Sequence, residues 1–144
     1  APAAICRKVI EAQITGSNAI EIWGDGQQTR SFMWIDDCLK GIEAITESEI
    51  VEPINLGSSE LVSINPLVDI VEAIAGVKLK RSYNLSAPKG VNGRNSDNTL
   101  IKKLLGWEPD TRLRVGLERT YRWIFDEMKR TGYRPGAPLP KGVH

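Results

Sequence analysis

The stretch AIEIWGDGQQTRSF, residues 19–32, decides how this chain folds. Ile20 and Ile22 alternate with the polar Glu21, and this alternation predicts a half-buried strand. Two glycines around Asp25 then predict a sharp turn, which leads directly into the polar segment QQTR. Glycines let a backbone approach a ligand closely, so the segment after the turn is a candidate ligand-binding segment.

Helices are predicted on both sides of this stretch, because apolar residues recur there at helical spacing. The predicted helices run from Pro2 to the break at Gly16, from Asp36 to near Ser48, from Ser63 to Gly76, from Ser96 or Asp97 to Gly106, and from Thr111 past Met128. Asp36 and Ser63 are the expected N-caps of their helices, and Thr111 is expected to open the last one.

Short extended segments separate these helices. Besides residues 19–23, the sequence patterns predict extended chain over residues 31–35 and strands over residues 53–56 and 78–85. Strands that alternate with helices indicate an α/β fold, but three or four short strands are too few for a doubly wound sheet. The strands therefore suggest an incomplete unit.

Length and composition are those of one ordinary globular domain, with 144 residues, 41% of them hydrophobic, and a net charge of +1. We expect the domain to cover residues 1–131, followed by a Pro/Gly-rich tail over residues 132–144.

No apolar run approaches the roughly 20 residues that span a bilayer, and the balanced charge disfavours a general nucleic-acid binder. Cys6 and Cys38 lack metal-ligand spacing, which favours buried thiols and a cytoplasmic location.

Side chains suited to catalysis are sparse. The only histidine, His144, is the last residue, which argues against Ser-His-Asp, Cys-His and histidine-metal schemes. No tyrosine is followed four residues later by the lysine that would help to polarise a hydroxyl beside nicotinamide. The glycine turn fails the dinucleotide-binding fingerprint, because its sixth position is Thr29. Helix capping explains Asp36, beside Asp37, better than acid-base chemistry does. We predict no catalytic, cofactor-binding or metal-binding residue in this segment, and no turnover by the segment alone.

Two polar segments remain as candidates for holding a ligand. Gln28, Thr29 and Arg30 follow the glycine turn, and Arg94 with Asn95 lies in a second glycine-containing loop. Arginine binds phosphate oxygens with two parallel hydrogen bonds, and hydrogen bonds to charged groups contribute about 1.5 to 3 kcal/mol each. Two converging arginines could therefore anchor a diphosphate, although composition alone favours surface ion pairs over a phosphate site.

These segments resemble a known family. GDGQQTRSF at residues 24–32, followed by IDD at residues 35–37, resembles the segment that extended short-chain dehydrogenases use beside a nucleotide-sugar diphosphate. These enzymes form the NAD-dependent epimerase/dehydratase family. The chain also resembles the GDP-mannose 3,5-epimerase family within it, at APAAICRK (residues 1–8), NLGS (residues 55–58), GRNSDN (residues 93–98) and LGW (residues 105–107). LGW is shared by many sugar-nucleotide enzymes, whereas APAA, QTRSF and GRNSDN are the narrower motifs.

The resemblance runs from Ala1 to about Met128 and implies the carboxy-terminal substrate-binding segment of such an enzyme. It implies an α/β fold with a few short strands and about five helices, without most of the Rossmann sheet. The residues that it implies as contacts of the nucleotide-sugar are Lys8, Gln28, Thr29, Arg30 and Arg94. It also implies an acid-base lysine just before Ala1, NAD bound by an amino-terminal domain, and a homodimer of the full-length enzyme.

Two departures from the family pattern leave the substrate open. Asn92 stands where the family has a basic residue, and residues 133–144 have no clear counterpart. One alternative is a related UDP-sugar 4-epimerase or nucleotide-sugar 4,6-dehydratase, because the general motifs are shared among these enzymes. Another is a noncatalytic relative that binds a nucleotide or RNA, which the basic last third of the sequence suggests.

Overall fold

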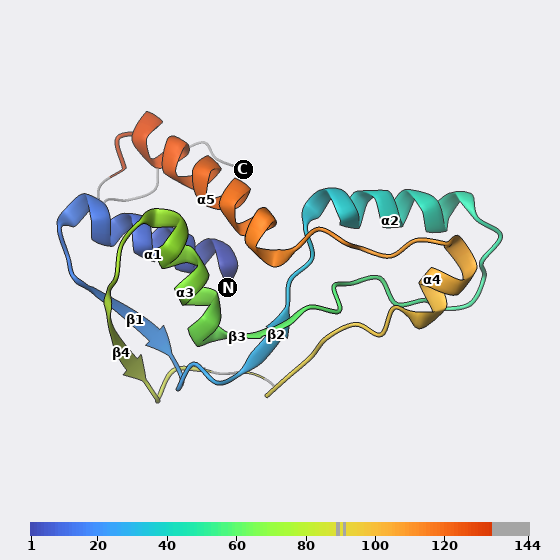
Figure 1. The fold of residues 1–144 in the computed structure, drawn as a ribbon, viewed down its shortest axis with the longest axis horizontal. Helices are drawn as coiled ribbons and strands as arrows, with labels where there is room; N and C mark the ends of the chain where they lie inside the picture. Colours follow the sequence, from blue (N-terminus) through green and yellow to red (C-terminus); the bar gives the residue numbers. More distant parts are fainter. Residues whose placement is uncertain (89, 91, 134–144) are drawn as a thin grey trace.

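The computed structural model describes residues 1–88, 90 and 92–133. Over these residues the chain forms five helices and four short strands, arranged as Figure 1 shows. In chain order they are α1 (Pro2–Thr15), β1 (Ala19–Trp23), β2 (Thr29–Ser31), α2 (Ile35–Glu47), β3 (Leu61–Ser63), α3 (Ile64–Ala75), β4 (Lys80–Asn84), α4 (Thr99–Leu105) and α5 (Leu113–Arg130). This mixed α/β architecture, with five helices and few strands, confirms the expected fold class.

The hydrophobic core lies among α1, α3 and α5, which pack against one another at one end of the molecule (Figure 1). Apolar residues recur every three or four positions along these helices, so each helix buries one face. Val9 in α1, Leu67 and Val71 in α3 and Leu117 in α5 are all buried. Burial of each such side chain contributes about 1.5 to 3 kcal/mol. We call these three helices, together with β1 and β4, the helical core.

β1 and β4 form a two-stranded parallel sheet at the edge of this core. Ile20 and Ile22 of β1 are buried, as their alternation predicted. At the end of the pair Trp23 lies opposite Asn84, and the backbone N–H of Gly24 donates to the Asn84 carbonyl at 2.8 Å. The turn after β1 is therefore tied to the end of β4.

β2 pairs in antiparallel fashion with β3 along one edge. Its other edge is bonded to a loop far along the chain, because the Thr29 N–H donates to the Asn92 carbonyl at 2.9 Å and the Ser31 N–H to the Arg94 carbonyl at 3.2 Å. These two bonds bring the segment that bears Arg94 alongside the one that bears Arg30.

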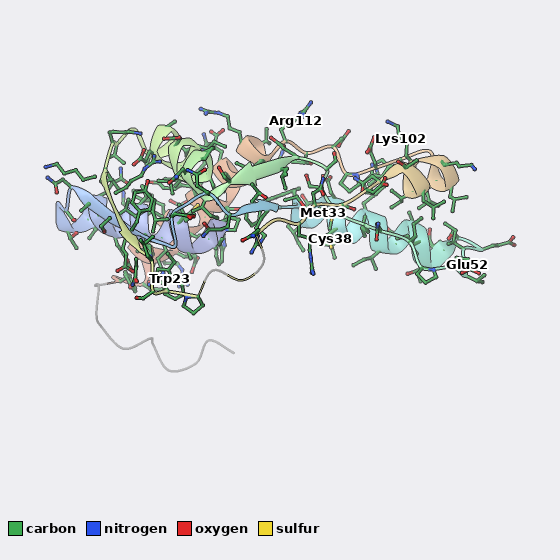
Figure 2. All side chains as sticks on the ribbon, turned by 90° about the horizontal axis from the view of Figure 1, so that it is seen from below. Trp23, Met33, Cys38, Glu52, Lys102 and Arg112 are labelled. Carbon is green, nitrogen blue, oxygen red and sulfur yellow. The ribbon has the colours of Figure 1, made fainter. Side chains whose placement is uncertain are left out.

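The remaining helices lie away from the core. We call α2, α4 and the segments 48–58 and 96–110 the outer region, which Figure 1 shows at the end of the molecule opposite α1. Figure 2, in the perpendicular view, places Glu52 and Lys102 at this same end and Trp23 near the other. The molecule is therefore elongated, and β2 and β3 lie between its two ends.

Hydrogen bonds across the segments of the outer region hold it together. The Asn98 side chain donates to the Gly57 carbonyl at 2.8 Å, and the Asn55 side chain donates to the Asp97 carbonyl at 3.4 Å. α2 turns Gly41 toward this layer, where a Cβ atom would overlap with the Leu56 side chain. The opposite face of α2 is apolar and exposed.

The predicted helices are confirmed, with small differences at their ends. α1, α3 and α4 end at the predicted glycines, each of which adopts the left-handed conformation that favours glycine there. Ser63 is the N-cap of α3, as predicted, although its side chain makes no capping hydrogen bond. α4 and α5 begin after Asn98 and Arg112, one or two residues beyond the predicted starts. Of the predicted tail, residues 134–144 lie outside the described residues.

Near α2 the prediction was wrong in two respects. Asp36 is not the N-cap, because α2 begins at Ile35 and Trp34 is the capping residue. The Asp36 carboxylate instead accepts a hydrogen bond from the Trp34 indole at 2.9 Å. Of the extended chain that we predicted over residues 31–35, only Ser31 belongs to a strand, because β2 covers Thr29–Ser31 beside its partner and α2 already begins at Ile35.

The predicted strand over residues 53–56 is also wrong. None of the described residues pairs with this segment as a strand, and side-chain hydrogen bonds such as that of Asn55 hold it instead. A strand needs a neighbour for its backbone groups, and an apolar sequence alone does not supply one. β3, in contrast, is only three residues long, so its sequence gave no signal.

Candidate functional site

The candidate site begins at the turn between β1 and β2. Gly24 and Gly26 have positive φ angles of 77° and 74°, which glycine adopts without strain. Between them, the Asp25 carboxylate accepts a hydrogen bond from the Gln27 N–H at 3.0 Å. The turn directs the chain from the sheet of the helical core toward β2, so the residues that follow it lie at the border of the two regions.

A cavity of about 350 Å³ lies on the helical-core side of this border. We call it the apolar cavity, because isoleucines from α1, β1 and α3 supply much of its wall. Its lining residues are Ala1, Ala4, Ile5, Arg7, Lys8, Ile20, Glu21, Ile22, Trp23, Gln28, Arg30, Ile64 and Pro88. Three of the five predicted contact residues, Lys8, Gln28 and Arg30, thus meet in one cavity although they come from different elements.

Lys8 and Trp23 lie next to each other in this lining. The Lys8 ammonium donates to the Glu21 carbonyl at 2.8 Å and lies 5.8 Å from the centre of the Trp23 ring. The Trp23 indole N–H is bonded to the Glu21 carboxylate at 3.0 Å, which fixes the orientation of the ring. The tryptophan remains 53% exposed. The cavity therefore offers an exposed aromatic face beside a cation.

Gln28 is fixed by its neighbour across the turn. Its side-chain N–H donates to the Trp23 carbonyl at 2.9 Å. Its side-chain oxygen is buried and has no hydrogen-bond partner among the described residues. Buried polar atoms are normally paired, so this oxygen is a local exception at the cavity wall.

A second hollow, which we call the arginine cleft, has a volume of about 310 Å³. Its lining residues are Arg30, Ser31, Asn55, Leu56, Gly57, Arg94, Asn95 and Ser96. Arg30 also lines the apolar cavity, so its side chain lies between the two hollows. The guanidinium donates to the Thr29 carbonyl at 2.6 Å, and a Cβ atom on Gly90 would come within 3.3 Å of it. The glycine therefore leaves space beside the arginine.

Arg94 approaches the cleft from the opposite chain segment. Its side chain is exposed and makes no hydrogen bond or ion pair with any described residue. Its guanidinium donors are thus available to an anionic ligand. With Arg30 in the same lining, the cleft places two cations where the sequence predicted convergence.

Thr29 has a different position from the other predicted contacts. Its side chain lines neither hollow. The hydroxyl donates to the Asn92 carbonyl at 3.4 Å, and a Cβ atom on Gly93 would lie 2.6 Å from that hydroxyl. In this structure Thr29 joins the loop that bears Arg94 to β2.

Several lining residues were missed in the sequence. Trp23 and Ile64 in the apolar cavity, and Asn55 and Ser96 in the arginine cleft, were not predicted as ligand contacts. Trp23 had a usable signal, because it ends a predicted strand directly before the glycine turn. The other three take their places through contacts between distant segments.

One buried carboxylate and one buried thiol, those of Asp37 and Cys6, lie outside the two hollows. Both oxygens of the Asp37 carboxylate accept hydrogen bonds from Thr111, at 3.0 Å each, and join α2 to the segment before α5. Burial raises the pKa of the Cys6 thiol to about 11, so this thiol is not a nucleophile. Cys38 is only half-buried, which differs from the expectation of two buried thiols.

No group of three or more histidine, cysteine, aspartate or glutamate side chains that could hold a metal ion occurs in the part of the chain that the structure describes. None of the helices described is both long enough and apolar enough to cross a membrane.

The chain is similar in sequence to curated epimerases. It is 48% identical over 130 residues to GDP-mannose 3,5-epimerase of Arabidopsis thaliana, which covers 90% of this chain and 33% of that enzyme. It is 40% identical over 111 residues to UDP-glucuronate 4-epimerase of Thermodesulfobacterium geofontis, which covers 76% of this chain and 34% of that enzyme. The chain thus spans about a third of the length of these relatives. No protein-family model matches it.

A solved structure gives the same result for the fold. UDP-glucuronic acid 4-epimerase of Bacillus cereus, in complex with UDP-glucuronic acid and NAD, superposes with a TM-score of 0.74 at 31% identity. The match covers 85% of this chain and 40% of that one. Both the motifs around the candidate site and these similarities agree, and the chain therefore belongs to the NAD-dependent epimerase/dehydratase family of extended short-chain dehydrogenases.

Proposed function

We propose that this chain is the substrate-binding part of an NAD-dependent epimerase that acts on a nucleotide-diphosphate sugar of the GDP-mannose type. The observation that carries this proposal is the position of Arg30, which lines both the apolar cavity and the arginine cleft. A nucleotide-sugar has a flat aromatic base at one end, joined through a ribose to two phosphates, and the two hollows match this division. The 48% identity to a GDP-mannose 3,5-epimerase supports the choice of sugar nucleotide.

In this proposal the nucleoside occupies the apolar cavity. Trp23 offers an exposed ring on which a base can stack, and Lys8 lies beside that ring as a cation. The walls supplied by Ile20, Ile22 and Ile64 exclude water from the remaining surface of the nucleoside.

The diphosphate lies between Arg30 and Arg94. Arginine's planar guanidinium matches two phosphate oxygens at once, and both side chains border the arginine cleft. Each charged hydrogen bond contributes about 1.5 to 3 kcal/mol. Holding the diphosphate at this point fixes the direction in which the sugar extends, which is how remote binding energy is used to position a reacting group.

Catalysis belongs to the rest of the enzyme in this proposal. NAD binds to another part of the full-length protein and supplies reversible hydride transfer when bound. The full-length protein is a homodimer in the cytoplasm. The described residues of this chain contribute binding and orientation. We predict that the 144-residue chain alone does not turn over GDP-mannose in the presence of NAD.

Titration calorimetry with GDP-mannose on the full-length protein tests the role of Arg30. We expect Arg30→Ala to weaken binding by about 10- to 150-fold, which corresponds to the loss of one charged hydrogen bond. The matched control is Arg122→Ala, because Arg122 is an exposed arginine on α5 that pairs with Glu118 one turn away on the same helix. An unchanged affinity in Arg30→Ala, with both proteins folded, would contradict the proposal.

A second candidate is a related enzyme that acts on a UDP-sugar. The similarity to UDP-glucuronate 4-epimerases in both sequence and structure favours it. Product analysis of the full-length protein with GDP-mannose and with UDP-glucose separates the two candidates. Turnover of the UDP-sugar alone would replace our first proposal by this second one.

A further inference from the structure

Asn65, in the first turn of α3, contacts the glycine turn that precedes the candidate ligand-binding segment. Its backbone N–H donates to the Gly26 carbonyl at 3.0 Å. Its side-chain N–H donates to the Asp25 carbonyl at 3.3 Å. Two successive carbonyls of the turn are thus bonded to one residue of a core helix, which joins the turn to the helical core.

The fit between Asn65 and the turn is also steric. A Cβ atom on Gly26 would overlap with the amide oxygen of Asn65, and Gly26 has the positive φ angle that favours glycine. The asparagine side chain therefore fills the space that any larger residue at position 26 would need. The turn cannot shift toward α3 without a clash, and it cannot move away without breaking both hydrogen bonds.

β4 fixes Asn65 from the other side. The Tyr83 hydroxyl donates to the Asn65 amide oxygen at 3.0 Å, and the Arg81 guanidinium donates to the Asn65 backbone carbonyl at 3.3 Å. Because the amide oxygen is used by Tyr83, the amide N–H groups face the turn. Arg81 is itself bonded to the buried Glu72 carboxylate at 3.0 Å. The orientation of Asn65 is therefore set before any ligand binds.

We propose that Asn65 is a positioning residue for the ligand-binding segment. By holding the backbone of the turn at Asp25 and Gly26, it fixes the positions of the Gln28 and Arg30 side chains. Gln28 is thereby placed in the wall of the apolar cavity, and Arg30 in the walls of both hollows. The preceding residue, Ile64, lines the apolar cavity itself, so the first turn of α3 forms part of the cavity wall and also holds the turn. This inference rests on the proposed function for its consequence in binding, but the holding of the turn can be measured independently.

Amide hydrogen exchange in the full-length protein tests the holding of the turn directly. In Asn65→Ala we expect exchange at the amides of Gln27 and Thr29 to rise by about tenfold or more. Local opening of the turn in the wild type must break the hydrogen bonds of the Asn65 side chain, and the variant lacks this cost. Amides in α1 and α5 should exchange at their wild-type rates. Tyr83→Phe, which removes only the second support, should give a smaller rise at the same two amides.

Gln13→Ala is the matched control. Gln13 is also an amide that joins elements of the helical core, since it donates to the Ala75 carbonyl at 3.1 Å and accepts from the Tyr121 hydroxyl. It lies in α1 and lines neither hollow. We expect this variant to leave exchange in the glycine turn and affinity for GDP-mannose unchanged.

The calorimetric titration with GDP-mannose gives the second readout. We expect Asn65→Ala to weaken binding by about fivefold to tenfold, less than Arg30→Ala, because the phosphate donors remain but are less well placed. If Arg30→Ala weakens binding while Asn65→Ala changes neither binding nor exchange in the turn, the inference about Asn65 is wrong and the proposed function stands.

Two other outcomes are also decisive. If Asn65→Ala raises exchange throughout α1, α3 and α5, the residue supports the fold as a whole and the positioning role is overturned. If amide exchange in Asn65→Ala rises only in the turn, but neither Arg30→Ala nor Asn65→Ala changes the affinity for GDP-mannose, the holding of the turn by Asn65 is supported. In that case the proposed function, and with it the consequence for binding, is overturned.

Discussion

The helical core and the outer region are stabilised in different ways. In the helical core, three helices bury a continuous cluster of apolar side chains that includes Val9, Leu67 and Val71. In the outer region, α2 buries only Asp37 and Gly41, while Leu39 on its other face is 58% exposed. The hydrophobic effect thus dominates in the helical core. The outer region buries fewer apolar side chains, Ile101 of α4 among them, and depends more on hydrogen bonds between distant segments.

The difference explains where the candidate site lies. Arg30 and Arg94 lie on segments that connect the two regions, and the bonds of β2 to the 92–94 loop bring them together. The helical core supplies the rigid wall of the apolar cavity. A ligand at Arg30 would contact both the helical core and the outer region. Binding should therefore stabilise the segments that connect the two regions more than it stabilises either end of the molecule.

The largest effect is expected from a cavity in the helical core. Leu67 is fully buried among α1, α3 and α5, so Leu67→Ala should lower the free energy of unfolding by about 2 to 5 kcal/mol. Urea denaturation followed by circular dichroism measures this loss. A loss below about 1 kcal/mol would mean that the core is less tightly packed than the structure indicates.

The next largest effect concerns the buried carboxylate of the helical core. Glu72 is only 2% exposed and binds both Arg81 and Lys78. Glu72→Gln removes the buried charge, while the more exposed Asp69 carboxylate remains paired with both cations, and we expect a loss of about 2 to 3 kcal/mol. Lys102→Met, which removes an exposed ion pair with Glu108 in the outer region, is the control and should change the free energy of unfolding much less.

The same carboxylate predicts how stability depends on pH. Burial works to raise the pKa of Glu72, but hydrogen bonds from Lys78, Arg81 and a backbone amide outweigh it and hold the pKa below its ordinary value. A carboxyl whose pKa is lowered on folding stabilises the protein above the ordinary glutamate pKa of 4.5, and this contribution is lost as pH falls through the folded value. Acid titration of stability should therefore show a smaller decline in Glu72→Gln than in the wild type. Parallel curves would contradict this assignment.

A smaller effect is expected where the two regions meet. Asp37 is 9% exposed and accepts two hydrogen bonds from Thr111, so Asp37→Ala should cost about 1 to 3 kcal/mol. The loss should be local, with faster amide exchange at Thr111 and in the first turn of α5. Unchanged exchange there would show that these bonds do not hold α2 to α5.

The smallest effect is expected on the exposed face of α2. Leu39 contributes little buried area in this structure, so Leu39→Ser should change the free energy of unfolding of the 144-residue chain by less than about 0.5 kcal/mol. The contrast with Leu67→Ala, made on the same residue type, is the sharpest test of the difference between the two regions. A loss comparable to that of Leu67→Ala would contradict it.

The fold was predictable from the sequence where its determinants are local. α3 was predicted with its end at Gly76, because a regular apolar stripe and a terminating glycine lie within a dozen residues. The strand predicted over residues 53–56 failed, because an apolar run forms a strand only beside a partner. β3 was missed for the complementary reason, since its pairing with β2 and not its own three residues makes it a strand.

The candidate site was predictable as a set of residues but not as a geometry. Arginines after glycine turns are visible in the sequence, and family motifs added Lys8. The shared position of Arg30 between two hollows depends on backbone bonds between β2 and a loop some 60 residues away. Asn65 takes its role from the same long-range packing, and nothing in its immediate sequence distinguishes this role from an ordinary surface position. Trp23 differs, because its place at the end of a predicted strand, directly before the glycine turn, is visible in the sequence.

The central claim is that a nucleotide-sugar binds across Arg30, between the two hollows. Amide chemical-shift mapping of the isotope-labelled chain during titration with GDP-mannose tests it most directly. We predict the largest shifts at residues 20–23, 28–31 and 94–96, with α2 and α4 little changed. Shifts confined to the outer region, or no shifts at millimolar ligand, would contradict the claim.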